Sequence, residues 1–182
     1  QLRNCPEWVM FDQAALGLGL VTVPLYTDDR PDNVAYILRE ADVQVLLVQD
    51  SGRWRRLADA LGEDSSLKRV LLLDDSPASH ELAASDPRVR VVADWLPQTA
   101  GTLVFRDGLD PHALASIVYT SGTTGRPKGV MLSHNNMMSV AHGGLMLLDV
   151  YQEDMFLSFL PLSHTLERTV GYYLCIMTGS CV

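Results

Sequence analysis

Two kinds of hydrophobic pattern alternate along this chain. Segments with apolar residues three or four positions apart, as in amphipathic helices, are followed by short apolar runs rich in β-branched residues. This alternation is typical of parallel sheets, because parallel strands need helical crossovers and are buried on both faces. The sequence therefore predicts an α/β fold with a mostly parallel β-sheet flanked by helices.

The individual elements follow from these patterns and from helix-start signals such as Pro6, Pro31 and Ser133. We expect helices over 6–18, 31–41, 54–61, 134–148 and 166–179. We expect strands over 20–26, 43–49, 69–73, 88–93, 115–120, 129–133 and 155–161. The polar stretches 74–87 and 97–111 are interpreted as surface connections and not as domain boundaries.

Charge and cysteine content exclude several functions. The chain has 182 residues and a formal net charge of -8, with dispersed basic residues, which argues against nucleic acid as a partner. Its longest nearly uncharged stretch, 169–182, falls short of the roughly 20 apolar residues of a transmembrane helix. Three scattered cysteines without metal-ligand spacing favour buried thiols in a reducing compartment, and the cytoplasm is the expected location.

One short segment carries the strongest functional signal. "YTSGTTGRPKG", residues 119–129, lies between two expected strands. Its glycines Gly122 and Gly125 would expose backbone amides, and Lys128 adds a mobile positive charge. Its hydroxyl donors are Thr120, Ser121, Thr123 and Thr124. Such a density of donors predicts a loop that wraps the outer phosphates of a nucleotide.

Three better-known motifs do not fit this loop. In a Walker pattern starting at Gly122, the second glycine would fall on Pro127, which has no backbone donor. The spacing of the glycines also differs from the dinucleotide fingerprint. The hydrolase elbow G-x-S-x-G fails because Tyr119 stands at its first glycine, so Ser121 is not predicted to be a triad nucleophile.

The longer segment "YTSGTTGRPKGVMLSH" resembles the phosphate-loop signature of the adenylate-forming superfamily, the AMP-dependent synthetases and ligases. "LPLSHTLERT", residues 160–169, resembles the superfamily's second signature in the form found in long-chain fatty-acid-CoA ligases. "NCPEWVMFDQAALGLGLVTVPLY" and "VAYILREADVQVLLV" also resemble the opening of those ligases. The resemblance therefore covers nearly the whole chain.

The resemblance implies a two-step reaction that uses ATP, Mg²⁺ and coenzyme A. A fatty acid is activated as an acyl-adenylate, and the acyl group is then transferred to the thiol of coenzyme A. By matching position, Lys128 is implied in catalysis and phosphate binding, Thr120 in Mg²⁺ binding, and His164 in a site beside the substrate carboxylate. The implied phosphate loop comprises Thr120, Ser121, Gly122, Thr123, Thr124, Gly125 and Lys128. Glu167 and Arg168 are expected to pair locally.

The same resemblance bears on domain organisation. Residues 1–182 are expected to form part of the large N-terminal domain, with the rest of that domain and the C-terminal domain absent. We therefore expect the isolated chain to be inactive, and its open sheet edge to pair with another copy. Peripheral association of the parent enzyme with the inner face of the membrane stays open. Two alternatives also stay open: an adenylating enzyme for an amino or aryl acid, and a non-catalytic nucleotide-binding module.

Overall fold

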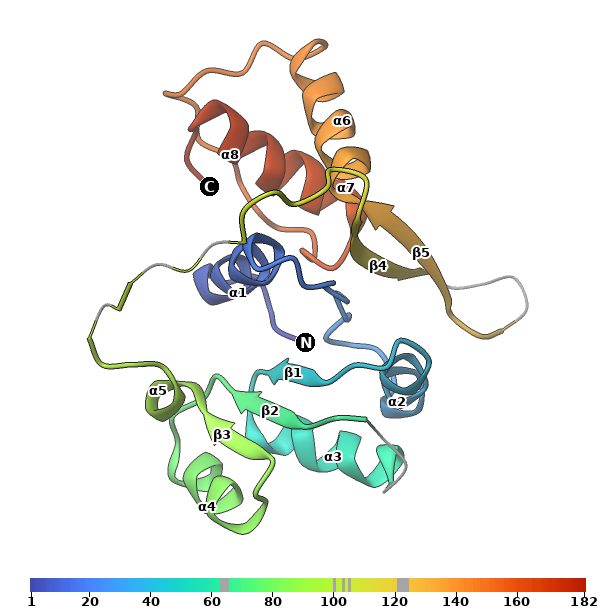
Figure 1. The fold of residues 1–182 in the computed structure, drawn as a ribbon, viewed down its shortest axis with the longest axis vertical. Helices are drawn as coiled ribbons and strands as arrows, with labels where there is room; N and C mark the ends of the chain where they lie inside the picture. Colours follow the sequence, from blue (N-terminus) through green and yellow to red (C-terminus); the bar gives the residue numbers. More distant parts are fainter. Residues whose placement is uncertain (63–65, 100, 103, 105, 121–124) are drawn as a thin grey trace. The chain divides into compact units, whose positions relative to one another are not determined.

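Two compact units make up the chain in a computed structural model, which describes residues 1–62, 66–99, 101–102, 104, 106–120 and 125–182 (Figure 1). Unit 1 comprises Gln1–Leu2 and Thr27–Val104. Unit 2 comprises Arg3–Tyr26 and Phe105–Val182. The boundary near residue 104 falls inside the stretch 97–111, so the interpretation of that stretch as a connection within one unit is wrong.

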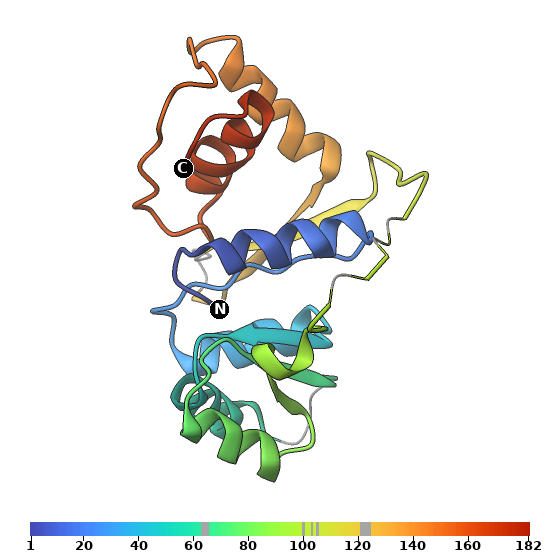
Figure 2. The same cartoon turned by 90° about the vertical axis from the view of Figure 1, so that its left-hand side faces the viewer.

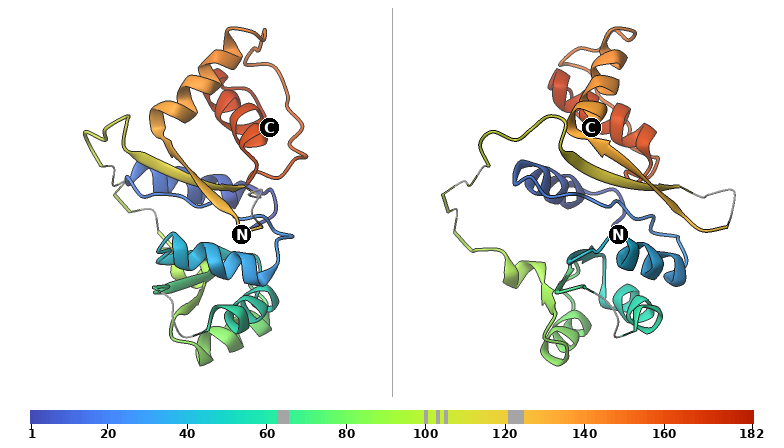
Figure 3. Two further views of the ribbon diagram at one scale, coloured as in Figure 1. Left: turned by 90° about the vertical axis from the view of Figure 1, so that its right-hand side faces the viewer. Right: turned by 45° about the vertical axis from the view of Figure 1, so that its right-hand side comes forward.

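Unit 1 alternates helices and parallel strands. Its elements are α2 (Pro31–Glu40), β1 (Val45–Val48), α3 (Ser51–Leu61), β2 (Arg69–Leu72), α4 (Pro77–Ser85), β3 (Val89–Val91) and α5 (Val92–Trp95). The strands pair in parallel in the order β1-β2-β3. Because α3 and α4 each connect neighbouring strands, right-handed crossovers place both helices on one face of the sheet (Figure 3).

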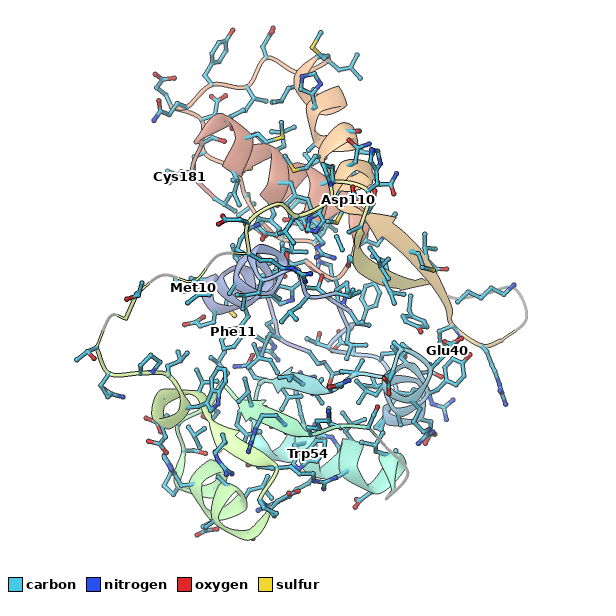
Figure 4. The ribbon with its side chains drawn as sticks, viewed as in Figure 1. Met10, Phe11, Glu40, Trp54, Asp110 and Cys181 are labelled. Carbon is cyan, nitrogen blue, oxygen red and sulfur yellow. The ribbon has the colours of Figure 1, made fainter. Side chains whose placement is uncertain are left out.

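The core of unit 1 is apolar. Val48, Val70 and Leu72 on the strands are fully buried. Trp54 on α3, labelled in Figure 4, is 1% exposed. The helices expected over 31–41 and 54–61 and the strands expected over 43–49, 69–73 and 88–93 are confirmed in type. The helix α3 begins three residues earlier than expected, and the other four elements are shorter than expected.

One helix of unit 1 was not predicted. Residues 77–85 form α4, where the sequence indicated only a surface connection. Ser76 caps this helix by accepting a hydrogen bond from the backbone N–H of Ser79, and Pro77 occupies its first turn. Ser79 is the one residue of α4 that is buried. A helix that exposes almost all of its surface carries no hydrophobic periodicity, which explains the error.

Unit 2 combines an antiparallel hairpin with helices. Its elements are α1 (Pro6–Gly17), β4 (Leu114–Thr120), β5 (Lys128–Ser133), α6 (His134–Leu145), α7 (Thr165–Arg168), the π-helix η1 (Thr169–Tyr173) and α8 (Leu174–Thr178). Strands β4 and β5 are antiparallel, and α6 and α8 pack side by side (Figure 2). Ser133 caps α6 in a capping box with Asn136, as its sequence position predicts.

Two expected strands of unit 2 are wrong. Segment 20–26 forms only an isolated parallel bridge between Thr22 and Ser116, and segment 155–161 only one between Met155 and Cys181. Pro24 contributes to the first result because proline cannot donate to a ladder. Met155, Leu157 and Phe159 are all more than 70% exposed, so the second segment buries little of its alternating apolar pattern.

The predicted fold class is confirmed: the protein is α/β, with a parallel sheet flanked by helices. All three cysteines are free, but only Cys175 has the expected burial. Within the described residues, no helix is both long and apolar enough to cross a membrane.

Candidate functional site

The glycine-rich segment connects the two strands of the hairpin. In the antiparallel register, Thr120 pairs with Lys128 as the last pair before the loop. Both residues are exposed. The structure therefore brings a hydroxyl and an ammonium group to the same end of the hairpin, on opposite strands.

Glycine is required at two positions of this hairpin. Gly125 has φ +86°, a backbone conformation that L side chains rarely adopt. Gly129 lies opposite Tyr119, and a Cβ atom there would be 2.8 Å from the Ile117 side chain and 3.1 Å from the Tyr119 ring. The ring of Tyr119 thus packs over Gly129, and Tyr119 is only 7% exposed.

Four residues of the predicted phosphate loop, Ser121, Gly122, Thr123 and Thr124, lie outside the described residues. Of the others, Thr120 and Lys128 are paired on neighbouring strands, and Gly125 is in a turn conformation. The strand-loop-strand arrangement expected from the sequence is confirmed for the residues on either side. The phosphate contacts themselves stay a prediction.

His164 caps α7. Its Nδ1 accepts a hydrogen bond of 3.2 Å from the backbone N–H of Leu166. An accepting Nδ1 carries no proton, so the neutral ring has its proton on Nε2 and can donate there. The side chain is exposed. Capping and a role toward a carboxylate are therefore compatible, because they use different nitrogens.

Four residues after His164, Arg168 enters the core of unit 2. Its Nη1 donates to Ser116 Oγ on β4 at 2.7 Å. Its Nη2 donates to Asp12 Oδ1 on α1 at 2.6 Å and to Thr22 Oγ1 at 2.8 Å. The Arg168 and Asp12 side chains are 3% and 5% exposed. One guanidinium thus joins α7, α1, β4 and the segment at Thr22.

Aromatic side chains complete this buried cluster. The guanidinium of Arg168 lies 5.5 Å from the ring centroids of Trp8 and Tyr173. The hydroxyls of Tyr172 and Tyr173 donate to Asp12 Oδ2 at 3.1 and 3.2 Å. Burial raises the pKa of both tyrosines far above the usual value, so they stay protonated and act as donors.

Sequence reasoning missed this cluster. Arg168 does not pair locally as expected but pairs with Asp12, 156 positions away. Glu167 is 6% exposed, and its carboxylate lies over Gly171, where a Cβ atom would be 2.5 Å from Oε1. Within the described part of the chain, Glu167 Oε1 and Arg168 Nε are buried without a hydrogen-bond partner. The only local signal was the acidic residue Asp12 in the middle of α1, which together with Gln13 interrupts an apolar stretch.

Unit 1 has a small pocket of its own beside α2 and α3. Its volume is about 80 Å³, and Gln1, Thr27, Asp29, Arg53 and Arg56 contribute its polar lining. Ligand pockets usually measure roughly 300–1,000 Å³, so this pocket is too small for a nucleotide. It contains none of the residues predicted to form the site.

The described residues offer no ready-made metal centre. They contain no group of three or more histidine, cysteine, aspartate or glutamate side chains that could hold a metal ion. Mg²⁺ in phosphoryl chemistry commonly takes only one or two protein oxygens, with the remaining positions filled by phosphate and water. Thr120, exposed at the end of β4, fits such a single-ligand role.

The fold is α/β, and its glycine- and hydroxyl-rich segment connects the two strands of a hairpin whose second strand begins at Lys128. The model of the family described as "AMP-binding enzyme" matches residues 1–182. The chain therefore belongs to the AMP-binding enzyme family.

Individual relatives agree with this membership. The chain is 32% identical over 180 residues to fatty acyl-CoA synthetase A of Dictyostelium discoideum, an alignment that covers 97% of the chain and 26% of the relative. It is 32% identical over 184 residues to the peroxisomal long chain acyl-CoA synthetase 7 of Arabidopsis thaliana, with the same coverage. The chain thus spans about a quarter of the length of these curated relatives.

The fold is also found among solved structures. An anthranilate CoA ligase in complex with anthranoyl-AMP superposes with a TM-score of 0.81. The two chains are 22% identical, and the match covers 99% of this chain and 33% of that one. This likeness supports the fold assignment.

Proposed function

We propose that this chain is part of an ATP-dependent acyl-CoA synthetase that activates a long-chain fatty acid as its acyl-adenylate and transfers it to coenzyme A. The observation that carries the proposal is the pairing of Thr120 with Lys128 at the end of the β4–β5 hairpin, in a chain of the AMP-binding enzyme family. The fatty-acid preference rests on the names of the curated relatives and on "LPLSHTLERT".

The reaction explains why such a loop is needed. A carboxylate oxygen attacks the α-phosphorus of ATP, and the bond to the β-phosphate oxygen breaks, releasing pyrophosphate. The coenzyme A sulfur then attacks the acyl carbon and AMP leaves. Negative charge grows on the departing pyrophosphate in the first step, so fixed donors aimed at it stabilise the transition state.

Each site residue has a proposed role. Lys128 pairs with the outer phosphates as a point charge, and residues 120–125 supply hydroxyl and amide donors. Mg²⁺ neutralises phosphate charge when bound, and Thr120 supplies one oxygen to it. His164 offers its Nε2 side to the carboxylate of the fatty acid while Nδ1 keeps its capping bond.

We further propose that residues 1–182 are part of a larger N-terminal domain and do not catalyse the reaction alone. Losing one preorganised donor can lower a rate roughly 10²- to 10³-fold, and the relatives are about four times as long as this chain. Self-association of the isolated chain through an open sheet edge stays a prediction, for which light scattering is the measurement.

A panel of carboxylic acids tests the function. In the complete protein, acid-dependent exchange of pyrophosphate into ATP should rise with fatty-acid chain length, because each buried methylene contributes about 0.8 kcal/mol. Preference for an amino or aryl acid, or for acetate, would contradict the fatty-acyl assignment. Nucleotide binding without exchange for any acid would instead indicate a non-catalytic module.

A further inference from the structure

Strand β4, which leads into the predicted phosphate loop, is hydrogen-bonded to the buried side chain of Arg168. Ser116 and Thr120 are both on β4, four residues apart, and therefore on the same face of the strand. The separation is about 13 Å at roughly 3.3 Å per residue. Ser116 is fully buried, and its hydroxyl accepts the hydrogen bond from Arg168 Nη1.

The Ser116 hydroxyl has its full set of partners. It donates to the backbone carbonyl of Thr22 at 2.9 Å and accepts from Thr22 Oγ1 at 3.2 Å, besides accepting from Arg168. A hydroxyl has one donor and two acceptor positions, so nothing is left over. Every one of these bonds ties β4 to segments distant in sequence.

Arg168 is the last residue of α7, and His164 caps the other end of this short helix. The backbone N–H of Arg168 donates to the carbonyl of His164 at 3.0 Å, within the first helical turn after the cap. Arg168 therefore connects the two sequence signatures physically, since its backbone belongs to the His164 turn and its guanidinium to the strand that ends at Thr120.

We propose that Arg168, acting through Ser116, is a positioning residue that fixes the β4 end of the phosphate loop relative to the His164 turn. The inference rests on the proposed function for its catalytic consequence. The contact between Arg168 and Ser116 is buried. Breaking it would leave a buried guanidinium N–H without a hydrogen-bond partner, so the contact should resist displacement of β4. Small displacements of a binding group are costly for catalysis, so loss of this contact should change the KM for ATP.

A matched pair of single-oxygen deletions in the complete protein tests the proposal. Ser116→Ala removes the contact between Arg168 and β4. Tyr172→Phe removes a hydroxyl from the same buried cluster, but that hydroxyl contacts Asp12 and Gln13, not β4. Both variants should unfold at lower temperature than the wild type. Only Ser116→Ala should raise the KM for ATP, by roughly three- to tenfold, with the KM for the fatty acid unchanged.

Two further measurements strengthen the test. Thr22→Val leaves the contact between Arg168 and Ser116 in place and should raise the KM for ATP less than Ser116→Ala does. Thr22→Ser keeps the hydroxyl that accepts from Arg168 and should have the wild-type KM. Hydrogen exchange of the β4 amides should be roughly tenfold faster in Ser116→Ala than in Tyr172→Phe. An unchanged KM for ATP in Ser116→Ala, or equal changes in both variants, would overturn the proposal.

The hydrogen-exchange measurement also separates this inference from the proposed function. If no carboxylic acid supports exchange of pyrophosphate into ATP by the wild-type protein, the proposed function fails. The positioning of β4 is then decided by hydrogen exchange alone: faster exchange in Ser116→Ala supports it, and equal exchange in the two variants overturns it.

Discussion

One arginine–aspartate pair of unit 1 and one of unit 2 differ in burial and in the separation of their partners along the sequence. In unit 1, Arg88 and Asp86 are two residues apart, 2.9 Å from nitrogen to oxygen, with side chains 40% and 19% exposed. In unit 2, Arg168 and Asp12 are 156 residues apart at 2.6 Å, with side chains 3% and 5% exposed. The first is a local, partly exposed contact, and the second is part of the core.

This difference shows how each unit is held together. Unit 1 relies on the apolar residues of a parallel sheet, and the Arg88 guanidinium lies 5.5 Å from the ring centroid of the buried Trp54. Unit 2 places a charged, hydrogen-bonded cluster where its helices and β4 meet. A buried pair is sensitive to the loss of either partner, since the charge left behind is uncompensated, whereas an exposed pair is screened by water.

The largest expected effect is the loss of stability when the buried Arg168–Asp12 pair is broken. Arg168→Met should lower the free energy of unfolding by about 3–5 kcal/mol, because it leaves Asp12 buried without a counter-charge. Arg88→Met is the matched control and should cost about 1 kcal/mol or less. Urea denaturation of both variants measures the difference. Equal losses in the two would contradict the distinction between the units.

The next largest effect is on pyrophosphate exchange, and it should differ between the two lysines. The chain has two, Lys128 beside the loop and Lys68, whose ammonium donates to Gln44 on the surface of unit 1. In the complete protein, Lys128→Ala should lower pyrophosphate exchange about ten- to a hundredfold, the equivalent of a charge-assisted bond of roughly 1.5–3 kcal/mol. Lys68→Ala should leave exchange at the wild-type rate. Wild-type exchange in Lys128→Ala would remove the proposed role.

The smallest effect is the pH dependence of the exposed pair. Hydrogen bonds from Arg88 lower the pKa of Asp86 below its ordinary value of 3.8. A lowered folded-state pKa contributes stability above the unfolded pKa, and this is lost as the pH falls through the folded value. Asp86→Asn should therefore cost at most about 1 kcal/mol at pH 7, and the difference from the wild type should shrink below about pH 3.8. Urea midpoints across this range provide the check, and a constant difference would contradict it.

The comparison also explains how much could be predicted from sequence. Helices α2 and α3 and strands β1 and β2 were recognised because their patterns are local, and the hairpin because its loop is so unusual. The role of Asp12 was not recognised, since an acidic residue in the middle of a helix does not identify a partner 156 residues away. Segment 20–26 was assigned to a strand on composition, although only Thr22 forms a bridge.

The candidate site was predicted in part. The strand-loop-strand pattern is confirmed on either side of the loop, but β5 begins at Lys128, one residue before the expected strand, so the pairing of Thr120 with Lys128 comes from the structure alone. What could not be foreseen is that Arg168 of the second signature would bond to Ser116, because that contact depends on how α7 packs against β4.

The most direct test of the central claim is detection of the intermediate. The complete protein, incubated with palmitate, Mg²⁺ and ATP without coenzyme A, should form palmitoyl-adenylate that mass spectrometry detects, and added coenzyme A should convert it to palmitoyl-CoA and AMP. The isolated chain of 182 residues should form none under the same conditions. Release of ADP and phosphate by the complete protein, or no adenylate with any fatty acid, would contradict the account.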